Sequence, residues 1–192
     1  MSVLVCVRLS GTVQSRAVRW PVVSGSPDGV SVSASCNVVV AVRDAGQLVI
    51  FTHTGQMVQS VKLPSSFASP RHAIQLDNDQ FLLCHGWGSS TYGIHVVGED
   101  GRIIRSAGDV LDSPRKSFAP TSLATDRRGN VLVAAFYGNT VQLYDRLLNY
   151  VTDAVPRSCG LTQPFRLCYD RDSGRLYVGE YSGMGRVFVF SA

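Results

Sequence analysis

A motif that begins with proline recurs four times along the chain and constrains its fold more than any other feature. Each copy continues with a short strand, a polar turn, an apolar strand, a second turn and an alternating strand, and the copies open at Pro27, Pro70, Pro120 and Pro164. These prolines are 43, 50 and 44 residues apart. A period in the mid-forties with four strands per unit is typical of β-propeller blades, because one small sheet cannot bury both of its faces and needs neighbours of its own kind. We therefore expect an all-β propeller.

The clearest copy is Ala119–Asp145. Its first turn ends at Gly129, and glycine is free to take the positive φ that such turns need. The run Asn130–Ala135 is apolar enough to be buried, whereas Thr140–Tyr144 alternates apolar and polar residues as a half-buried strand does. No segment has the 3.6-residue periodicity of an amphipathic helix, so helical repeats are excluded and no helix longer than one or two turns is expected.

The repeat divides the chain into a half blade, three complete blades and a final blade of three strands. We expect the half blade at residues 1–20, the complete blades at 27–64, 70–107 and 120–155, and the last blade at 164–191, all within a single domain, 1–192. The half blade is expected to be a hairpin of Ser2–Leu9 with Thr12–Trp20.

Two segments near the end of the chain carry a family resemblance. PTSLATDRRGNVLVAAFYGNTVQLYD and QPFRLCYDRDSGRLYVGEYSGMGRVFVF resemble NHL repeats, and SPRHAIQL with GIHVVGEDGRIIRSAG is similar to the NHL propellers at the C-terminal end of tripartite-motif proteins. The resemblance covers nearly the whole chain. It departs from the NHL pattern at the end of the second strand, where the usual acidic residue is present only as Glu180. NHL propellers usually have six blades, so the resemblance implies a partial propeller: about four blades in an open arc, with an unpaired edge strand at Arg186–Phe190.

The resemblance also implies a function. Tripartite-motif NHL propellers recognise targets or adaptors for ubiquitination, so we expect a non-catalytic scaffold that binds a protein. Single-stranded RNA binding is the alternative, and a metal-dependent hydrolase or lyase is a third, more distant reading. Any ubiquitin-ligase activity would belong to RING segments outside this chain. We expect no catalytic residue, cofactor, metal or small-molecule substrate.

The residue types that carry chemistry are scattered. Propeller geometry would allow His72, His85 and Glu180 to reach the same rim, but isolated histidines at strand ends are more often structural than metal ligands. Asp126, Asp170 and Asp172 have the spacing of calcium-loop residues, yet they stand in turns, where aspartate serves the backbone. The chain has no glycine-rich phosphate loop and no nucleophile motif.

The five cysteines are odd in number, and no two are separated by only two residues. This spacing indicates neither a disulfide framework nor a zinc site. Buried, reduced thiols in a cytoplasmic protein are the simplest interpretation, and one linked pair remains as an alternative. No segment approaches the roughly 20 apolar residues that cross a bilayer, so no membrane partner is expected.

The candidate binding residues are expected on one face, formed by the loops before the first strands and between the second and third strands. Exposed aromatic residues together with arginine are typical of interface hot spots. The candidates are Arg71, Trp87, Tyr92, Arg115, Lys116, Tyr137, Arg166 and Tyr181. Phe136 and Phe165 are expected to fill gaps between blades instead. The excess of positive charge on this face is small, which favours a protein over RNA.

Overall fold

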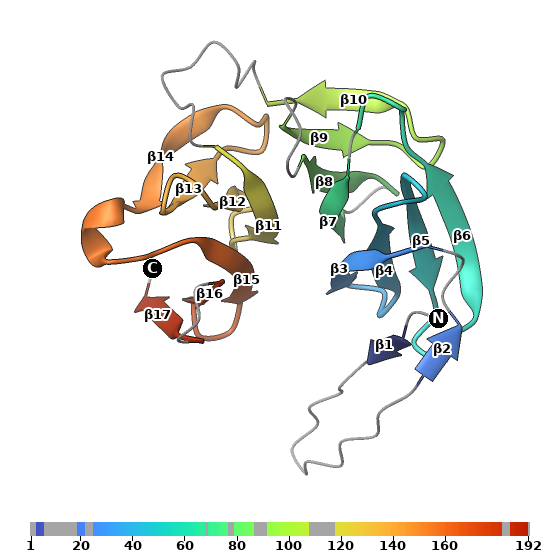
Figure 1. The fold of residues 1–192 in the computed structure, drawn as a ribbon, viewed down its shortest axis with the longest axis horizontal. Coiled ribbons are helices and arrows are strands. Elements are labelled where there is room, and N and C mark those ends of the chain that lie inside the picture. Colours follow the sequence, from blue (N-terminus) through green and yellow to red (C-terminus); the bar gives the residue numbers. More distant parts are fainter. Residues whose placement is uncertain are drawn as a thin grey trace.

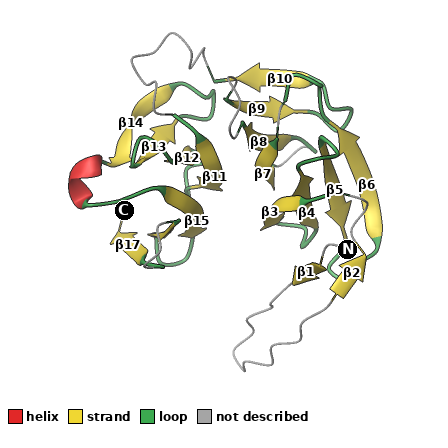
Figure 2. Ribbon diagram, viewed as in Figure 1, coloured by secondary structure: helices red, strands yellow, loops and turns green. Residues whose placement is uncertain are grey.

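The apolar run of each repeat forms the second strand of a sheet, and these sheets stand around a common centre (Figure 1). The computed structural model describes residues 25–67, 69–76, 79–86, 92–107, 118–181 and 185–191, with the backbone of two short strands nearer the N-terminus. Strands make up almost all of the regular structure among these residues, and the one helical segment found there is a single 3₁₀ turn, η1 (Arg157–Cys159) (Figure 2). Within the described residues, no helix has the length and apolar character needed to cross a membrane.

The first three blades are four-stranded antiparallel sheets in sequential order. The first blade is β3 (Pro27–Val32), β4 (Val38–Val42), β5 (Gln47–Phe51) and β6 (Met57–Lys62). The second blade is β7 (Pro70–Gln75), β8 (Phe81–His85), β9 (Gly93–Val97) and β10 (Ile103–Ser106). The third blade is β11 (Pro120–Thr125), β12 (Val131–Ala135), β13 (Thr140–Tyr144) and β14 (Tyr150–Val155).

The fourth blade has three strands: β15 (Pro164–Asp170), β16 (Arg175–Glu180) and β17 (Val187–Ser191). Two short strands nearer the N-terminus, β1 (Val3–Val5) and β2 (Arg19–Pro21), pair with each other. The four antiparallel sheets confirm the all-β propeller. The assignment of residues 1–192 to one domain with the expected boundaries stays a prediction.

Most of the core lies between neighbouring blades, because the sheets stack face to face, and one further buried cluster, around Val40 and Val49, consists of first-blade residues alone. Val39 and Ile50 of the first blade share a buried cluster with Phe81 and Leu83 of the second. The other side of β8 supplies Leu82 to a cluster with the third blade. A third cluster joins the third and fourth blades. Adjacent residues of a second strand therefore serve different clusters, as the two-residue period of a strand requires.

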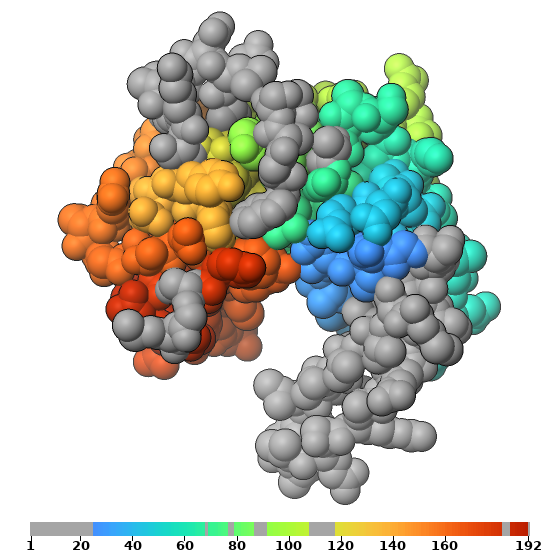
Figure 3. Space-filling view, in the orientation of Figure 1, coloured from blue at the N-terminus to red at the C-terminus, as the bar shows by residue number. Residues whose placement is uncertain are grey.

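The first and fourth blades meet near the centre. Figure 3 shows them in contact there, while the space between them widens toward the rim. The contact includes Arg166 of β15, whose Nη2 donates to the backbone oxygen of Asp28 in β3 at 2.8 Å. Among the described strands, β17 pairs with β16 and β2 pairs with β1, so the ring is not closed there by strand pairing.

Each first strand carries the same irregularity. The register with the second strand shifts directly after the opening proline, between Pro27 and Gly29 in the first blade and at the equivalent place in the other three. Such a bulge leaves one residue outside the regular pairing and re-aims its side chain. The four residues that follow the prolines are Asp28, Arg71, Thr121 and Phe165. The repeat thus places these four side chains at equivalent positions, where the first strands begin.

The first strands run through the propeller between two faces. We call the face where they begin the proline face, and the face where they end the turn face. On the turn face, Asp126 Oδ1 accepts the backbone N–H groups of Arg128 and Asn130, both at 2.8 Å. Asp145 makes the same pair of bonds to Leu147 and Asn149, and its bonds to Asn149 lower the pKa of its carboxyl. Both aspartates serve the backbone of their own turns, as predicted for Asp126.

Candidate functional site on the proline face

An ion pair at the centre of the proline face joins the first two blades. The Arg71 guanidinium donates to the Asp28 carboxylate, and both side chains are largely buried. Burial lowers the pKa of Arg71, and the attraction of Asp28 opposes that shift. A guanidinium without a partner in such a place would be costly, because a buried charge must be compensated.

Arg166 extends this contact to the other two blades. Its Nη1 donates to the backbone oxygen of Thr121 in the third blade at 3.2 Å, and its Nη2 lies 3.4 Å from Asp28 Oδ1. The guanidinium carbon is 4.1 Å from the ring centroid of Phe165, within the range of a cation–π contact. Asp28 therefore holds two arginines from two other blades, and Arg166 connects the fourth blade to the first and third.

Four aromatic side chains gather beside Arg166. The Phe165 and Tyr181 ring centroids are 5.0 Å apart, and Phe136 lies 5.7 Å from Tyr181 and 5.1 Å from Tyr137. Phe136 is buried, but Tyr137 and Tyr181 are 50% and 59% exposed. We call Phe136, Tyr137, Phe165, Arg166 and Tyr181 the aromatic–arginine patch.

The loops that supply the patch follow from the repeat. Phe136 and Tyr137 come directly after β12, and Tyr181 comes directly after β16, at the equivalent place in the next blade. The turn after β12 also holds the next blade, because the side-chain oxygen of Asn139 accepts the backbone N–H of Gln163 at 2.8 Å. The two exposed tyrosines therefore lie in turns that pack against a neighbouring blade, and not in an unsupported loop.

The structure brings together part of the predicted set. Tyr137, Tyr181 and Arg166 lie in the patch, while Arg71 lies beneath it and is only 4% exposed. Tyr92 packs against the core between the second and third blades instead. Trp87, Arg115 and Lys116 lie outside the described residues. Whether any of these residues contacts a partner stays a prediction.

The expectation for the two phenylalanines holds for Phe136, which is buried between blades, while Phe165 is half-buried and belongs to the patch. Sequence reasoning missed Asp28, although it stands one residue after its proline as Arg71 does. Because Asp28 and Arg71 occupy equivalent positions in neighbouring repeats, the repeat alignment could have predicted that they lie close together.

The histidines do not form a metal centre with Glu180. The His72 ring accepts the backbone N–H of Leu123 at Nδ1 and donates to the backbone oxygen of Val30 from Nε2, both at 3.2 Å. Glu180 binds Arg186 and the backbone N–H of Thr162. Within the described part of the chain, no group of three or more His, Cys, Asp or Glu residues is placed to hold a metal ion.

His85 and His95 form a pair of their own. A hydrogen bond of 3.1 Å joins their Nε2 atoms, so one ring donates and the other accepts, and Phe67 stacks on both rings. His95 Nδ1 also hydrogen-bonds to Ser106 Oγ at 2.8 Å. Burial, and then the neighbouring His85, lower the pKa of His95 to about 4. His95 is therefore neutral at physiological pH.

The cysteines differ from the sequence interpretation. Cys84 is buried, and burial raises the pKa of its thiol to about 12, but Cys36, Cys159 and Cys168 are exposed. All four are free thiols, so a disulfide among them is excluded. The expectation of buried thiols is wrong for three of the four cysteines that the structure describes.

Comparison with known proteins supports the propeller fold but assigns the chain to no family. No family model matches the chain, and no curated protein matches it. A solved protein of unknown function from Bacteroides caccae is similar at 15% identity with a TM-score of 0.58, over 93% of this chain and 66% of that one.

Two further similar structures are lyases. A catalytically inactive histidine-to-alanine variant of virginiamycin B lyase from Staphylococcus aureus, solved with quinupristin, is 15% identical with a TM-score of 0.58, over 86% of this chain and 55% of that one. A streptogramin B lyase is 10% identical with a TM-score of 0.61, over 93% of this chain and 59% of that one. The chain spans less than two thirds of the length of these three solved proteins. At these identities the likeness shows the fold alone.

The lyases correct one expectation. The sequence interpretation excluded enzyme activity because the chain resembles a binding propeller, but the similar solved propellers include enzymes. The exclusion is therefore wrong. The resemblance to the tripartite-motif NHL type is not confirmed, whereas the propeller fold is.

Proposed function

We propose that the proline face recognises a protein partner through the aromatic–arginine patch. The observation that carries the proposal is the exposure of Tyr137 and Tyr181 on a surface backed by Phe136, Phe165 and Arg166. Tyrosine and arginine are enriched among the residues that dominate interface energies, and rigid aromatic side chains lose little conformational entropy on binding.

The charge around the patch favours protein over RNA. Arg71 is neutralised by Asp28, and Arg166 shares the same carboxylate. Arg186 is paired with Glu180. A site for single-stranded nucleic acid needs a groove of uncompensated positive charge along the backbone, as well as stacking surfaces. The patch offers stacking surfaces with little net charge.

Site-specific photo-cross-linking tests the proposal. A photo-reactive phenylalanine analogue is placed at Tyr137, at Tyr181 and, as a control, at Leu147, an exposed apolar residue on the turn face. The proposal predicts the same discrete protein adducts at both tyrosine positions and their absence at Leu147. Adducts with RNA would support the alternative function. Equal adducts at all three positions would remove the patch as the binding surface.

Catalysis is the second candidate, and the similar lyases are the observation that favours it. One of them is inactive after a single histidine is replaced by alanine. In this chain the His72 nitrogens are both engaged by backbone groups, so His72 is not available as an acid or base. Incubating the chain with quinupristin and following its loss by chromatography tests this candidate directly, and turnover no faster than in buffer would exclude that substrate.

A further inference from the structure

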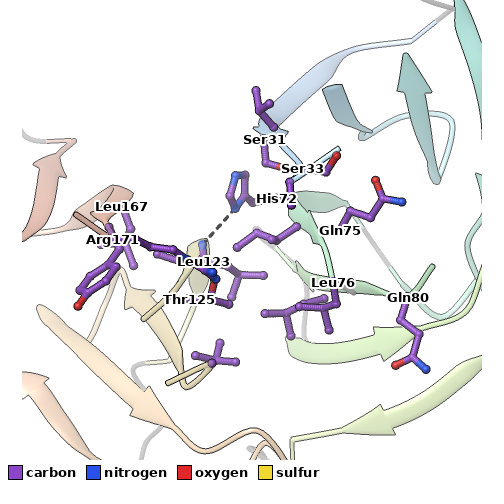
Figure 4. A pocket seen from close by; sticks show the side chains of 18 of the residues that line it. Ser31, Ser33, His72, Gln75, Leu76, Gln80, Leu123, Thr125, Leu167 and Arg171 are labelled. Carbon is purple, nitrogen blue, oxygen red and sulfur yellow. Dashed lines mark hydrogen bonds between the residues drawn. The ribbon is translucent and has the colours of Figure 1, made fainter. Parts of the chain in front are cut away.

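A cavity of about 940 Å³ lies at the centre of the propeller (Figure 4). All four first strands contribute to its wall, with Ser31 from β3, His72 from β7, Leu123 from β11 and Leu167 from β15. The lining continues to the turn face, through Arg127 and other residues of the turns. The cavity therefore lies on the side of the molecule away from the aromatic–arginine patch.

His72 gives the cavity an ordered inner wall. Its ring bridges backbone groups of Val30 in the first blade and Leu123 in the third, and Figure 4 draws the bond to Leu123. Burial lowers the pKa of His72 to about 4, so the ring carries no charge at neutral pH. The inner wall is thus neutral, rigid and shared by three blades.

The charged side chains of the lining are all arginines: Arg127, Arg146 and Arg171. Each is oriented by a hydrogen bond to an uncharged oxygen. Arg127 donates to the backbone oxygens of Arg171 and Asp172, Arg171 Nη2 donates to Thr125 Oγ1 at 3.0 Å, and Arg146 Nε donates to the backbone oxygen of Arg128 at 2.5 Å.

No carboxylate forms an ion pair with these arginines within the described part of the chain, although attraction to Arg127 contributes to the lowered pKa of Asp170. None of the ion pairs found there includes Arg127, Arg146 or Arg171. The nearby turn carboxylates of Asp126 and Asp170 accept hydrogen bonds from groups of their own turns and do not line the cavity. Three guanidinium groups around one opening supply charged donors that suit an anion.

The rest of the wall is largely apolar. Val30 and Val32 are 46% and 59% exposed although they are aliphatic, and both line the cavity. Ile74, Leu76 and Leu82 extend the apolar surface across the second blade. Ligand sites commonly combine such an apolar wall with a few polar groups that fix the orientation of the ligand.

We propose that the central cavity binds a small organic anion with an apolar body, such as a carboxylate, phosphate or sulfonate on a hydrocarbon or aromatic group. The acid group lies against Arg127, Arg146 and Arg171, and the apolar body lies against Val30, Val32 and Leu123. The sequence interpretation expected no small-molecule substrate. This site is independent of the proposed partner surface, because it opens on the other face and shares no residue with the patch.

Two naphthalene dyes provide the test. Anilinonaphthalene sulfonate carries a negative charge, while phenylnaphthylamine has a similar apolar body and no charge, and the fluorescence of both rises in an apolar site. The purified chain is titrated with each dye. The proposal predicts saturable binding of the sulfonate, displaced by dodecanoate or dodecyl phosphate but not by dodecanol, and weaker binding of the neutral dye. Competition by only one of the two dodecyl anions would identify the acid group that the site prefers.

Matched variants test whether the dye binds in the cavity. Replacing two guanidinium groups, R146Q with R171Q, should weaken sulfonate binding by about tenfold, because bonds to charged groups are lost, and should leave the neutral dye nearly unchanged. Arg128 is exposed, adjoins Arg127 and does not line the cavity, so R128Q should bind both dyes like the unchanged chain. V32W should weaken both dyes by filling the opening, and Val32 is exposed enough to accept the change.

Circular dichroism of each variant verifies folding, and the single variant R171Q carries the same test if the double variant does not fold. Sulfonate binding that is unchanged in the arginine variants and in V32W would overturn the proposal. Equal affinity of the unchanged chain for the charged and the neutral dye would also overturn it.

Discussion

Replacing Asp28 by Asn should destabilise the whole propeller, because this carboxylate compensates a buried guanidinium. The Arg71 side chain is 5% exposed and the Asp28 side chain 11%, whereas the Arg166 side chain is 40% exposed and therefore remains partly solvated. Removing one partner of a buried ion pair typically costs about 3–5 kcal/mol, since the other charge is left uncompensated. We expect about 3 kcal/mol here, the lower end, because the amide of Asn still accepts a hydrogen bond.

The free energy of unfolding, measured by urea denaturation, gives the size of the effect. A double-mutant cycle with R71M separates the pair from other consequences, because the double variant D28N with R71M has no buried charge and should recover most of the loss. The exposed pair Arg43–Asp44 supplies the control, and D44N should leave stability essentially unchanged. A loss below about 1 kcal/mol in D28N, or no recovery in the double variant, would refute the argument that this ion pair holds the blades together.

Three further outcomes follow from the geometry. G29A should lower the urea midpoint and the free energy of unfolding, the latter by at least about 1–3 kcal/mol, because an added Cβ would lie 2.2 Å from the backbone oxygen of Arg71. A midpoint equal to that of the unchanged chain would contradict this close approach. His72 should contribute about 3 kcal/mol of stability that is complete above pH 6.5 and is lost as the pH drops toward 4, because its pKa is about 4 when folded and 6.5 when unfolded. His95, whose pKa is also about 4, adds to the loss in the same window, so H72Q should reduce the slope in urea titrations without removing it, while H53Q, at an exposed turn, should leave it unchanged. The edge strand β17 pairs with β16 and exposes Val187 and Val189, so sedimentation should show that the chain associates as its concentration rises. The double variant V187K with V189K should associate less. A chain that stays monomeric at high concentration would argue against an open edge.

The sequence was informative wherever a structure depends on neighbours along the chain. The buried strand predicted at Asn130–Ala135 is observed as β12, Val131–Ala135, because a continuous apolar run between turn residues leaves few alternatives. The aspartates at 126 and 170 also behave as predicted, since an Asx turn requires only residues within the turn.

The site depends on contacts that no local pattern specifies. Arg166 and Asp28 are 138 residues apart, and their meeting follows from the angle at which four blades pack. The same holds for the burial of Arg71, which the sequence analysis placed on an exposed face. The bulge after each proline decides where these side chains point, and a shift of one residue in strand pairing is not visible in hydrophobic alternation. The central cavity likewise combines residues from every blade.

The most direct test of the proposed function is the affinity of the chain for the protein captured at the patch. Isothermal titration of that protein with the unchanged chain, with Y137A and with Y181A should show a loss of about 2 kcal/mol for each tyrosine, little dependence on salt, and no loss for the control L147A. Tyrosine variants that bind like the unchanged chain would contradict the account. So would affinity for single-stranded RNA that falls steeply with salt and is abolished by R166E.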